Sequence, residues 1–157
     1  YLKAQVDSFC LLSASSQTWM FETDLSVLRT VLNRKSQTTV GNKLDAVIVT
    51  ERDVAGRASF LTLYGEHIVV VRGEHFRSAV IPYFGPRSIR STKFNVERVG
   101  NAFAFEGQGF GHGVGLCQVG AMARARAGHS LRDILTHYYP GTTLAAYDRN
   151  STGLYYH

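Results

Sequence analysis

The sequence predicts an α+β fold, with a mostly antiparallel sheet and with helices that follow a glycine-rich loop. Short runs of β-branched and aromatic residues alternate with turn signals, which is typical of β-hairpins. Two later segments have the start and stop residues of helices. The 157 residues are 45% hydrophobic and 18% charged, so they suffice for one globular domain or most of one. We expect that domain over 1–147.

The first elements are a strand and a helix. Residues 18–23, around Trp19, predict a short strand. Asp24 is expected to cap a helix over 25–33, because leucines at 25, 28 and 32 share one helical face. Runs rich in β-branched residues at 44–52, 57–64 and 67–72 then predict an antiparallel meander.

The middle of the chain predicts one more helix and one more hairpin. We expect a short helix over 74–80 that Pro82 ends, followed by a loop over 82–86. Strands over 91–99 and 102–106 should turn at Gly100-Asn101.

Two helices are expected after the glycine run. The first covers 115–127 and stops at Gly128. The second covers 131–139. Ser130 and Asp133 form a capping-box pair at its start, and Pro140 ends it. The polar tail over 148–157 is expected to fray, although Leu154-Tyr155-Tyr156 alternatively predicts a last strand.

Composition narrows the classes of partner. A net charge of +5 favours acidic partners, namely nucleic acid, an anionic membrane surface or an anionic wall polymer. Arginines at 124, 126 and 132 form the densest cationic group, for which a solvated helix face is the simpler interpretation. We expect no nucleic-acid partner, because the sequence has no base-reading or RNA-stacking motif. No apolar span of 18 residues is present, so we predict no membrane anchor in this chain.

The two cysteines, Cys10 and Cys117, do not form a disulfide framework, and the chain has no C-x-x-C pair for a structural zinc site. We therefore expect no cofactor held by this chain. Cys117 stands near a predicted helix start, which lowers a thiol pKa, but an inert buried cysteine is the favoured interpretation. The opening Tyr1-Leu2-Lys3 suggests a piece of a longer protein.

The glycine run, Gly107 to Gly115, places a glycine at every second position around His112. It matches neither a Walker loop nor a dinucleotide fingerprint. Two interpretations stay open. Bare main chain between a strand and a helix can dock an anion or a sugar edge, or the glycines can serve a tight crossing of two backbones.

Several side chains near the run could carry chemistry. His112 has no neighbouring side chain to shield it, and imidazole suits proton transfer or hydrogen bonding to a sugar. The Gln118 amide both donates and accepts, as sugar hydroxyls require. Glu106 could protonate a glycosidic oxygen, although an ordinary surface glutamate is the simpler interpretation. His137 and Tyr138 end an aromatic helix, where tyrosines stack on sugars but at this spacing more often pack partly in a core.

Two motifs in order resemble the SpoIID/LytB family, which comprises stage II sporulation protein D and amidase enhancers. The segment from Phe105 to Ala121 is similar to the family signature, and Ile134 to Thr142 is similar to its continuation. The stretch from Arg57 to Gly65 and the pair Arg77-Ser78 resemble family segments more distantly. The resemblance covers the C-terminal half of the family domain.

The resemblance implies an extracytoplasmic lytic transglycosylase that cleaves peptide-stripped peptidoglycan glycan strands, or an enhancer of a cell-wall amidase. It implies that His112 is catalytic, with Glu106 as a further candidate. The implied substrate-binding residues are Gly109, Gly111, Gly113, Gln118, His137, Tyr138 and Arg77. The glutamate motif of the family is absent here, so we expect it upstream, and this piece alone should be inactive. Zinc ligands of some members also lie upstream.

Overall fold

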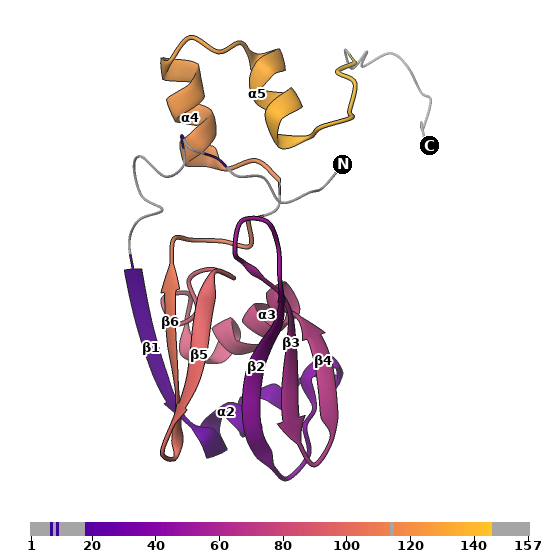
Figure 1. The fold of residues 1–157 in the computed structure, drawn as a ribbon, viewed down its shortest axis with the longest axis vertical. Coiled ribbons are helices and arrows are strands. Elements are labelled where there is room, and N and C mark those ends of the chain that lie inside the picture. The colour runs from indigo at the N-terminus through magenta and orange to yellow at the C-terminus, as the bar shows by residue number, and fades with distance from the viewer. Residues whose placement is uncertain (1–6, 8, 10–17, 114, 146–157) are drawn as a thin grey trace.

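Two three-stranded antiparallel sheets, side by side in Figure 1, form the body of this computed structural model. The structure describes residues 7, 9, 18–113 and 115–145. One sheet has the order β1 (Thr18–Asp24), β6 (Ala102–Gln108), β5 (Phe94–Val99), and the other β2 (Leu44–Arg52), β3 (Ala58–Gly65), β4 (Ile68–Arg72). The predicted α+β class, the meander and the hairpin at Gly100-Asn101 are confirmed.

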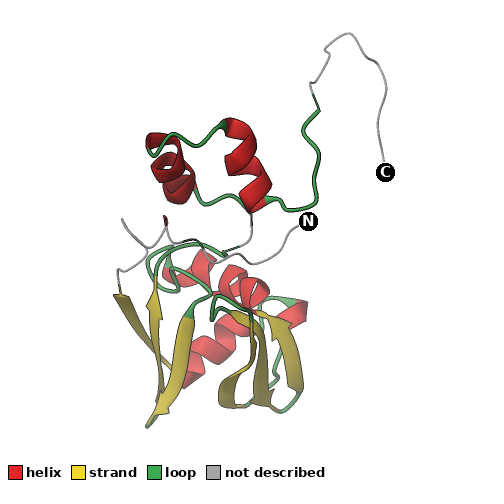
Figure 2. Cartoon of the chain, turned by 45° about the horizontal axis from the view of Figure 1, so that its top comes forward, coloured by secondary structure: helices red, strands yellow, loops and turns green. Residues whose placement is uncertain are grey.

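Helices α2 (Leu25–Leu32) and α3 (Gly73–Phe84) pack behind the sheets and close the core (Figures 1 and 2). At its centre Phe76, Phe94 and Phe105 form a triangle with ring centroids 5.7–6.1 Å apart. Such tilted aromatic contacts add to the free energy of apolar burial. Asp24 directly precedes α2 as predicted, but its side chain makes no capping hydrogen bond.

The prediction that Pro82 ends the helix expected over 74–80 is wrong, because α3 continues through it to Phe84. A proline lacks the N–H that would bond to the carbonyl four residues back, here that of Ser78. Lys35 Nζ donates to this carbonyl instead, at 2.8 Å, so the proline costs the helix less. The helix ends before Gly85, whose φ is +87°.

The glycine run begins inside the sheet. Strand β6 continues two residues beyond the predicted end at Glu106, because Gly107 pairs with both Trp19 and Phe94. An added Cβ at Gly107 would lie 2.2 Å from an indole carbon of Trp19, so this glycine serves close packing.

Helices α4 (Gln118–Arg126) and α5 (Leu131–Tyr138) lie beyond the end of the sheets at which β6 stops, and the glycine run leads from β6 to them (Figures 1 and 2). Helix α4 begins three residues later than predicted, since Cys117 is its N-cap and its Sγ accepts from the Gly120 N–H. The Ser130–Asp133 capping box at α5 is confirmed. The predicted boundary at 147, the tail and the alternative last strand over 154–156 lie outside the described residues.

Candidate functional site

Four glycines of the run adopt backbone angles that side chains rarely allow. The φ values are +71° at Gly109, +73° at Gly111, +75° at Gly113 and +81° at Gly115. The alternation in the sequence is therefore a conformational requirement of the loop. Beyond that, an added Cβ would meet nothing within 4 Å at Gly111, whereas at Gly113 it would overlap the guanidinium of Arg57. The main chain is thus open at Gly111, whereas Gly113 makes room for the Arg57 side chain and Gly107 makes room for the Trp19 indole and the Lys93 carbonyl.

The main chain of the loop is anchored to the segment 90–92 of the body. The Gly111 N–H donates to the Arg90 carbonyl at 2.8 Å, and the Thr92 N–H donates to the Gly111 carbonyl at 3.2 Å. The Thr92 hydroxyl donates to the carbonyl of His112 at 3.0 Å. These bonds hold the backbone on both sides of the histidine.

Arg57 supports the same loop from the side. Its Nη1 donates to the Gly111 carbonyl at 3.2 Å, and its side chain packs where Gly113 has none. The arginine is itself placed by a tight turn in which Asp53 Oδ1 accepts from the Arg57 N–H at 2.9 Å. Sequence reasoning missed Arg57 and Thr92 as supports of the loop, because each lies far from it in the chain.

The side chains at the tip of this loop face outward. His112 is exposed, although its main-chain carbonyl accepts from Thr92. Phe110 is 54% exposed, and the Arg90 guanidinium lies 5.8 Å from its ring centroid. Gln118 is exposed at the first position of α4. The loop therefore presents an imidazole, an aromatic ring and an amide around open main chain at Gly111. Phe110 is a further residue that the predictions left out.

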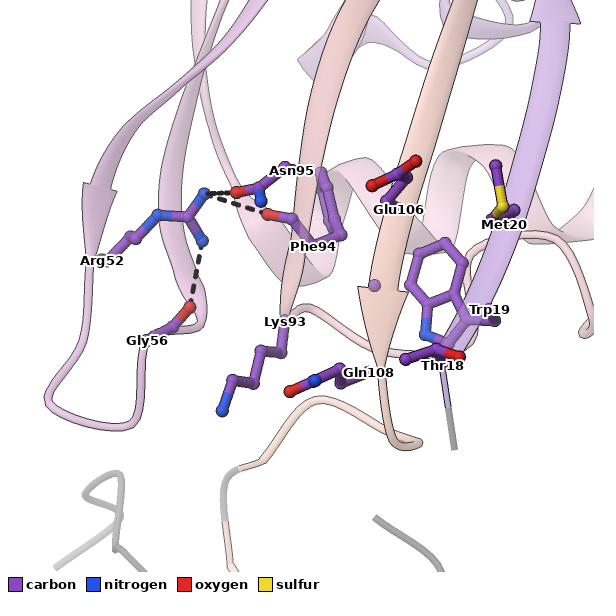
Figure 3. A pocket seen from close by; sticks show the side chains of 11 residues that line it. Thr18, Trp19, Met20, Arg52, Gly56, Lys93, Phe94, Asn95, Glu106 and Gln108 are labelled. Atoms are coloured by element: carbon purple, nitrogen blue, oxygen red, sulfur yellow. Dashed lines mark hydrogen bonds between the residues drawn. The ribbon is translucent and has the colours of Figure 1, made fainter. Parts of the chain in front are cut away.

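Glu106 lies apart from the tip, on the outer face of the β1–β6–β5 sheet. Its exposed side chain lines an open cleft of about 430 Å³ together with Lys93, Asn95 and Gln108 (Figure 3).

Arg77 lies half-buried on α3, where its Nε donates to the Ile89 carbonyl at 2.9 Å. Burial lowers the pKa of its guanidinium; Glu74 opposes the shift and the charge of Arg57 adds to it. The bond to Ile89 ties α3 to the segment that leads to Arg90 and the loop.

His137 and Tyr138 belong to a third location, a buried polar cluster between α4, α5 and Asp7. Arg124 Nη2 lies 3.0 Å from Asp7 Oδ1 and 2.9 Å from His137 Nε2, and the Tyr138 hydroxyl donates to Asp7 Oδ2. The Arg124 and Asp7 side chains are only 12% and 7% exposed. The predicted solvated helix face is therefore wrong for Arg124.

The cluster shifts the ionisation of its members. Burial opposes ionisation of Asp7, but hydrogen bonds from Tyr138 and Arg124 outweigh it and lower the Asp7 pKa. Burial raises the Tyr138 pKa, and the hydrogen bond to Asp7 adds to this shift. Burial and the charge of Arg124 lower the His137 pKa, so this imidazole is neutral and Nε2 accepts from Arg124. Gly120 permits the contact, since an added Cβ would overlap Asp7 and the Tyr138 hydroxyl.

A hydrogen bond joins the residue after the glycine run to the residue after α5. The Leu116 N–H donates to the hydroxyl of Tyr139, which follows the two predicted residues, at 3.3 Å. The predicted residues thus occupy a loop tip, a sheet cleft and a buried cluster, with Arg77 apart from all three on α3. His112 and Gln118 adjoin the tip, Glu106 faces the cleft, and His137 and Tyr138 lie in the cluster.

Among the described residues, no three His, Cys, Asp or Glu side chains gather as metal ligands. The expectation that zinc ligands lie upstream stays a prediction. Within the same residues, no helix is both long and apolar enough to cross a membrane.

A protein-family model described as "Domain of unknown function (DUF8618)" matches residues 2–115, from before β1 to the end of the glycine run. The chain belongs to this family. The DUF8618 match includes the loop tip and the sheet cleft and ends before α4.

The DUF8618 chain is also similar to curated proteins. It is 46% identical over 63 residues to the amidase enhancer of Bacillus subtilis (strain 168), covering 40% of this chain and 9% of that protein. It is 42% identical over 60 residues to stage II sporulation protein D of Bacillus amyloliquefaciens, covering 38% of this chain and 17% of that protein. These matches confirm the predicted SpoIID/LytB-like assignment. The chain spans less than a fifth of the length of the curated relatives it matches.

Proposed function

We propose that this chain binds peptide-stripped glycan strands of peptidoglycan, as part of an extracytoplasmic SpoIID-like protein that cleaves them. The observation that carries the proposal is the exposed His112 on a loop whose carbonyls are held from behind by Thr92 and Arg57. A loop fixed in this way presents its imidazole without first paying an ordering entropy on binding.

The loop tip has the chemistry that a sugar strand requires. At Gly111 a pyranose can approach the main chain, because the space beside its Cα is open. The exposed ring of Phe110 offers an apolar face for the C–H groups of a sugar. Amide and imidazole groups of Gln118 and His112 can donate to and accept from hydroxyls.

Cleavage of a glycosidic bond needs a carboxylic acid that protonates the leaving oxygen. In this proposal that acid is a glutamate outside the described residues, which acts first as general acid and then as general base. His112 hydrogen-bonds near the reacting oxygen and orients it. Glu106 is the carboxylate of this chain nearest in sequence to the loop, and it remains a further candidate for the acid.

The name of one relative supports a second candidate function, that of a non-catalytic module that enhances a cell-wall amidase.

Two experiments separate the candidates. Pulldown of the chain on peptide-free glycan tests binding, and release of soluble sugar by the full-length protein tests cleavage. Binding and release together support the cleavage proposal. Binding without release, together with faster turnover of an added amidase, supports the enhancer. Absence of binding contradicts both.

A further inference from the structure

The outer face of the β1–β6–β5 sheet carries an ordered polar array beside the proposed binding loop. The strand register places Met20, Glu106 and Asn95 in one row across β1, β6 and β5. Thr18 and Gln108 pair in the next row, where the Gln108 N–H donates to the Lys93 carbonyl at 2.9 Å. We call this concave surface of about 430 Å³ the sheet cleft (Figure 3).

Arg52 forms one wall of the sheet cleft. Its guanidinium donates to the carbonyls of Gly56 and Phe94, both at 3.0 Å, and to Asn95 Oδ1 at 2.7 Å. These dashed bonds in Figure 3 fix the wall, and all three acceptors are neutral. The positive charge of Arg52 therefore has no carboxylate partner among the described residues.

The other polar side chains of the cleft are not engaged by the protein. Lys93, Glu106 and Gln108 make no side-chain hydrogen bond or ion pair within the ranges that the structure describes. The cleft thus holds two cations and one carboxylate, without an ion pair to neutralise them. Trp19, which is 4% exposed, also lines it, and its buried indole Nε1 has no acceptor in the part of the chain that the structure describes.

The cleft is continuous with the loop in the chain, because Gln108 ends β6 and Gly109 opens the loop. A polymer that lies along the loop tip can therefore continue across the sheet. The surplus positive charge favours a polymer with carboxylates, while Glu106, Gln108 and the Asn95 amide favour one with hydroxyl or amide groups. An acidic, hydroxyl-rich saccharide combines these groups.

We infer that the sheet cleft is a second binding subsite, in which the Lys93 ammonium pairs with a carboxylate of an acidic saccharide strand and Glu106 and Gln108 bind its hydroxyl or acetamido groups. This inference rests on the proposed function, since the strand is the one that the loop tip binds.

The test uses two probes of equal length. One is a peptide-free glycan octasaccharide, which carries lactyl carboxylates, and the other is a neutral chito-octasaccharide. Trp19 is the only tryptophan of the sequence and lines the cleft, so its fluorescence and its indole N–H resonance report on occupancy. The variant is Lys93→Glu, and the matched control is Lys43→Glu, at an exposed lysine outside the cleft.

We expect Lys93→Glu to weaken binding of the acidic probe roughly tenfold, because a favourable ion pair becomes a repulsion. Binding of the neutral probe should change little, and Lys43→Glu should behave as wild type. The acidic probe should shift the Trp19 signals of the wild-type chain. Equal losses in both variants, equal losses for both probes, or a silent Trp19 would each overturn the subsite.

Failure of this inference is distinguishable from failure of the proposed function. If wild type binds neither probe, the proposed function fails and the subsite fails with it. If His112→Ala abolishes binding while Lys93→Glu leaves it intact, only the subsite fails. Equal competition by a single-stranded DNA of the same charge would mark the cleft as a general anion surface and contradict its assignment to saccharides.

Discussion

The body of the protein and its helical pair, α4 with α5, are held together by different physical means. The body buries a continuous apolar core around Phe76 and Phe105. The helical pair instead buries an ion pair, Asp7 with Arg124, beside the buried side chains of Ile134 and Tyr138.

Because the two parts are held together differently, they support the glycine run that joins them in different ways. The body anchors the loop tip through Thr92 and Arg57, and the body itself is held together by an apolar core, whose packing should not respond to pH. The helical pair holds the exit of the loop through Tyr139 and depends on charges, so it should respond to pH.

Removing a core ring should destabilise the body most. Phe76→Ala deletes a fully buried ring that contacts Phe94 and Phe105, and should lower the free energy of unfolding by roughly 3–5 kcal/mol. Urea denaturation followed by Trp19 fluorescence measures it. Ile68→Ala, on the exposed face of β4, is the control and should change stability by less than about 0.5 kcal/mol. Similar losses in both variants would contradict an apolar core centred on Phe76.

Removing the acidic member of the buried cluster should act on the helical pair alone. Asp7→Ala leaves the Arg124 charge buried without its partner, which costs about 3 kcal/mol. We expect circular dichroism to show loss of helix while the urea transition reported by Trp19 stays at its wild-type midpoint. Asp45→Ala, at an exposed position of β2, is the control. A shifted Trp19 transition would mean that the two parts unfold as one unit.

A smaller effect should appear in the stability of the helical pair, which should depend on pH. Burial and Arg124 lower the folded-state pKa of His137 below 6.5, with Asp7 opposing and His129 adding to the shift. The unfolded state therefore takes up the proton first as pH falls. The stability from neutral His137 is complete above about pH 6.5 and is lost as pH falls through the folded-state pKa.

Thermal melts at pH 7.5 and 5.5, followed by helix circular dichroism, measure this effect. The helical pair should melt at a lower temperature at pH 5.5, and His137→Gln, which keeps a hydrogen-bond acceptor, should reduce the difference. The Trp19 transition should not move between these pH values. An unchanged pH difference in His137→Gln would assign the effect to another group of the cluster.

The elements that sequence reasoning predicted depend on neighbours in the chain. The Ser130–Asp133 capping box and the Gly100-Asn101 hairpin are set by a few consecutive residues, and both are confirmed. Pro82 could not be interpreted in this way, because the bond that compensates its helix comes from Lys35, which lies 43 residues before the Ser78 carbonyl that it reaches.

The candidate site was predictable in its position but not in its supports. The alternating glycines and His112 mark the loop in the sequence, and the structure exposes that histidine. Its supports, Arg57 and Thr92, lie 54 residues and 20 residues from the carbonyls they bond, and no local pattern encodes such contacts. Gly113 carried the available signal, since a glycine can mark a place where a distant side chain packs on the main chain.

The central claim, that the loop tip binds a glycan strand through His112, is tested most directly by titrating peptide-free glycan into the chain and its His112→Ala variant. The control is His75→Ala, at an exposed histidine of α3. We predict that His112→Ala loses at least tenfold in affinity with an unchanged melting temperature, while His75→Ala binds as wild type. Equal affinity of all three proteins for the glycan would contradict the account.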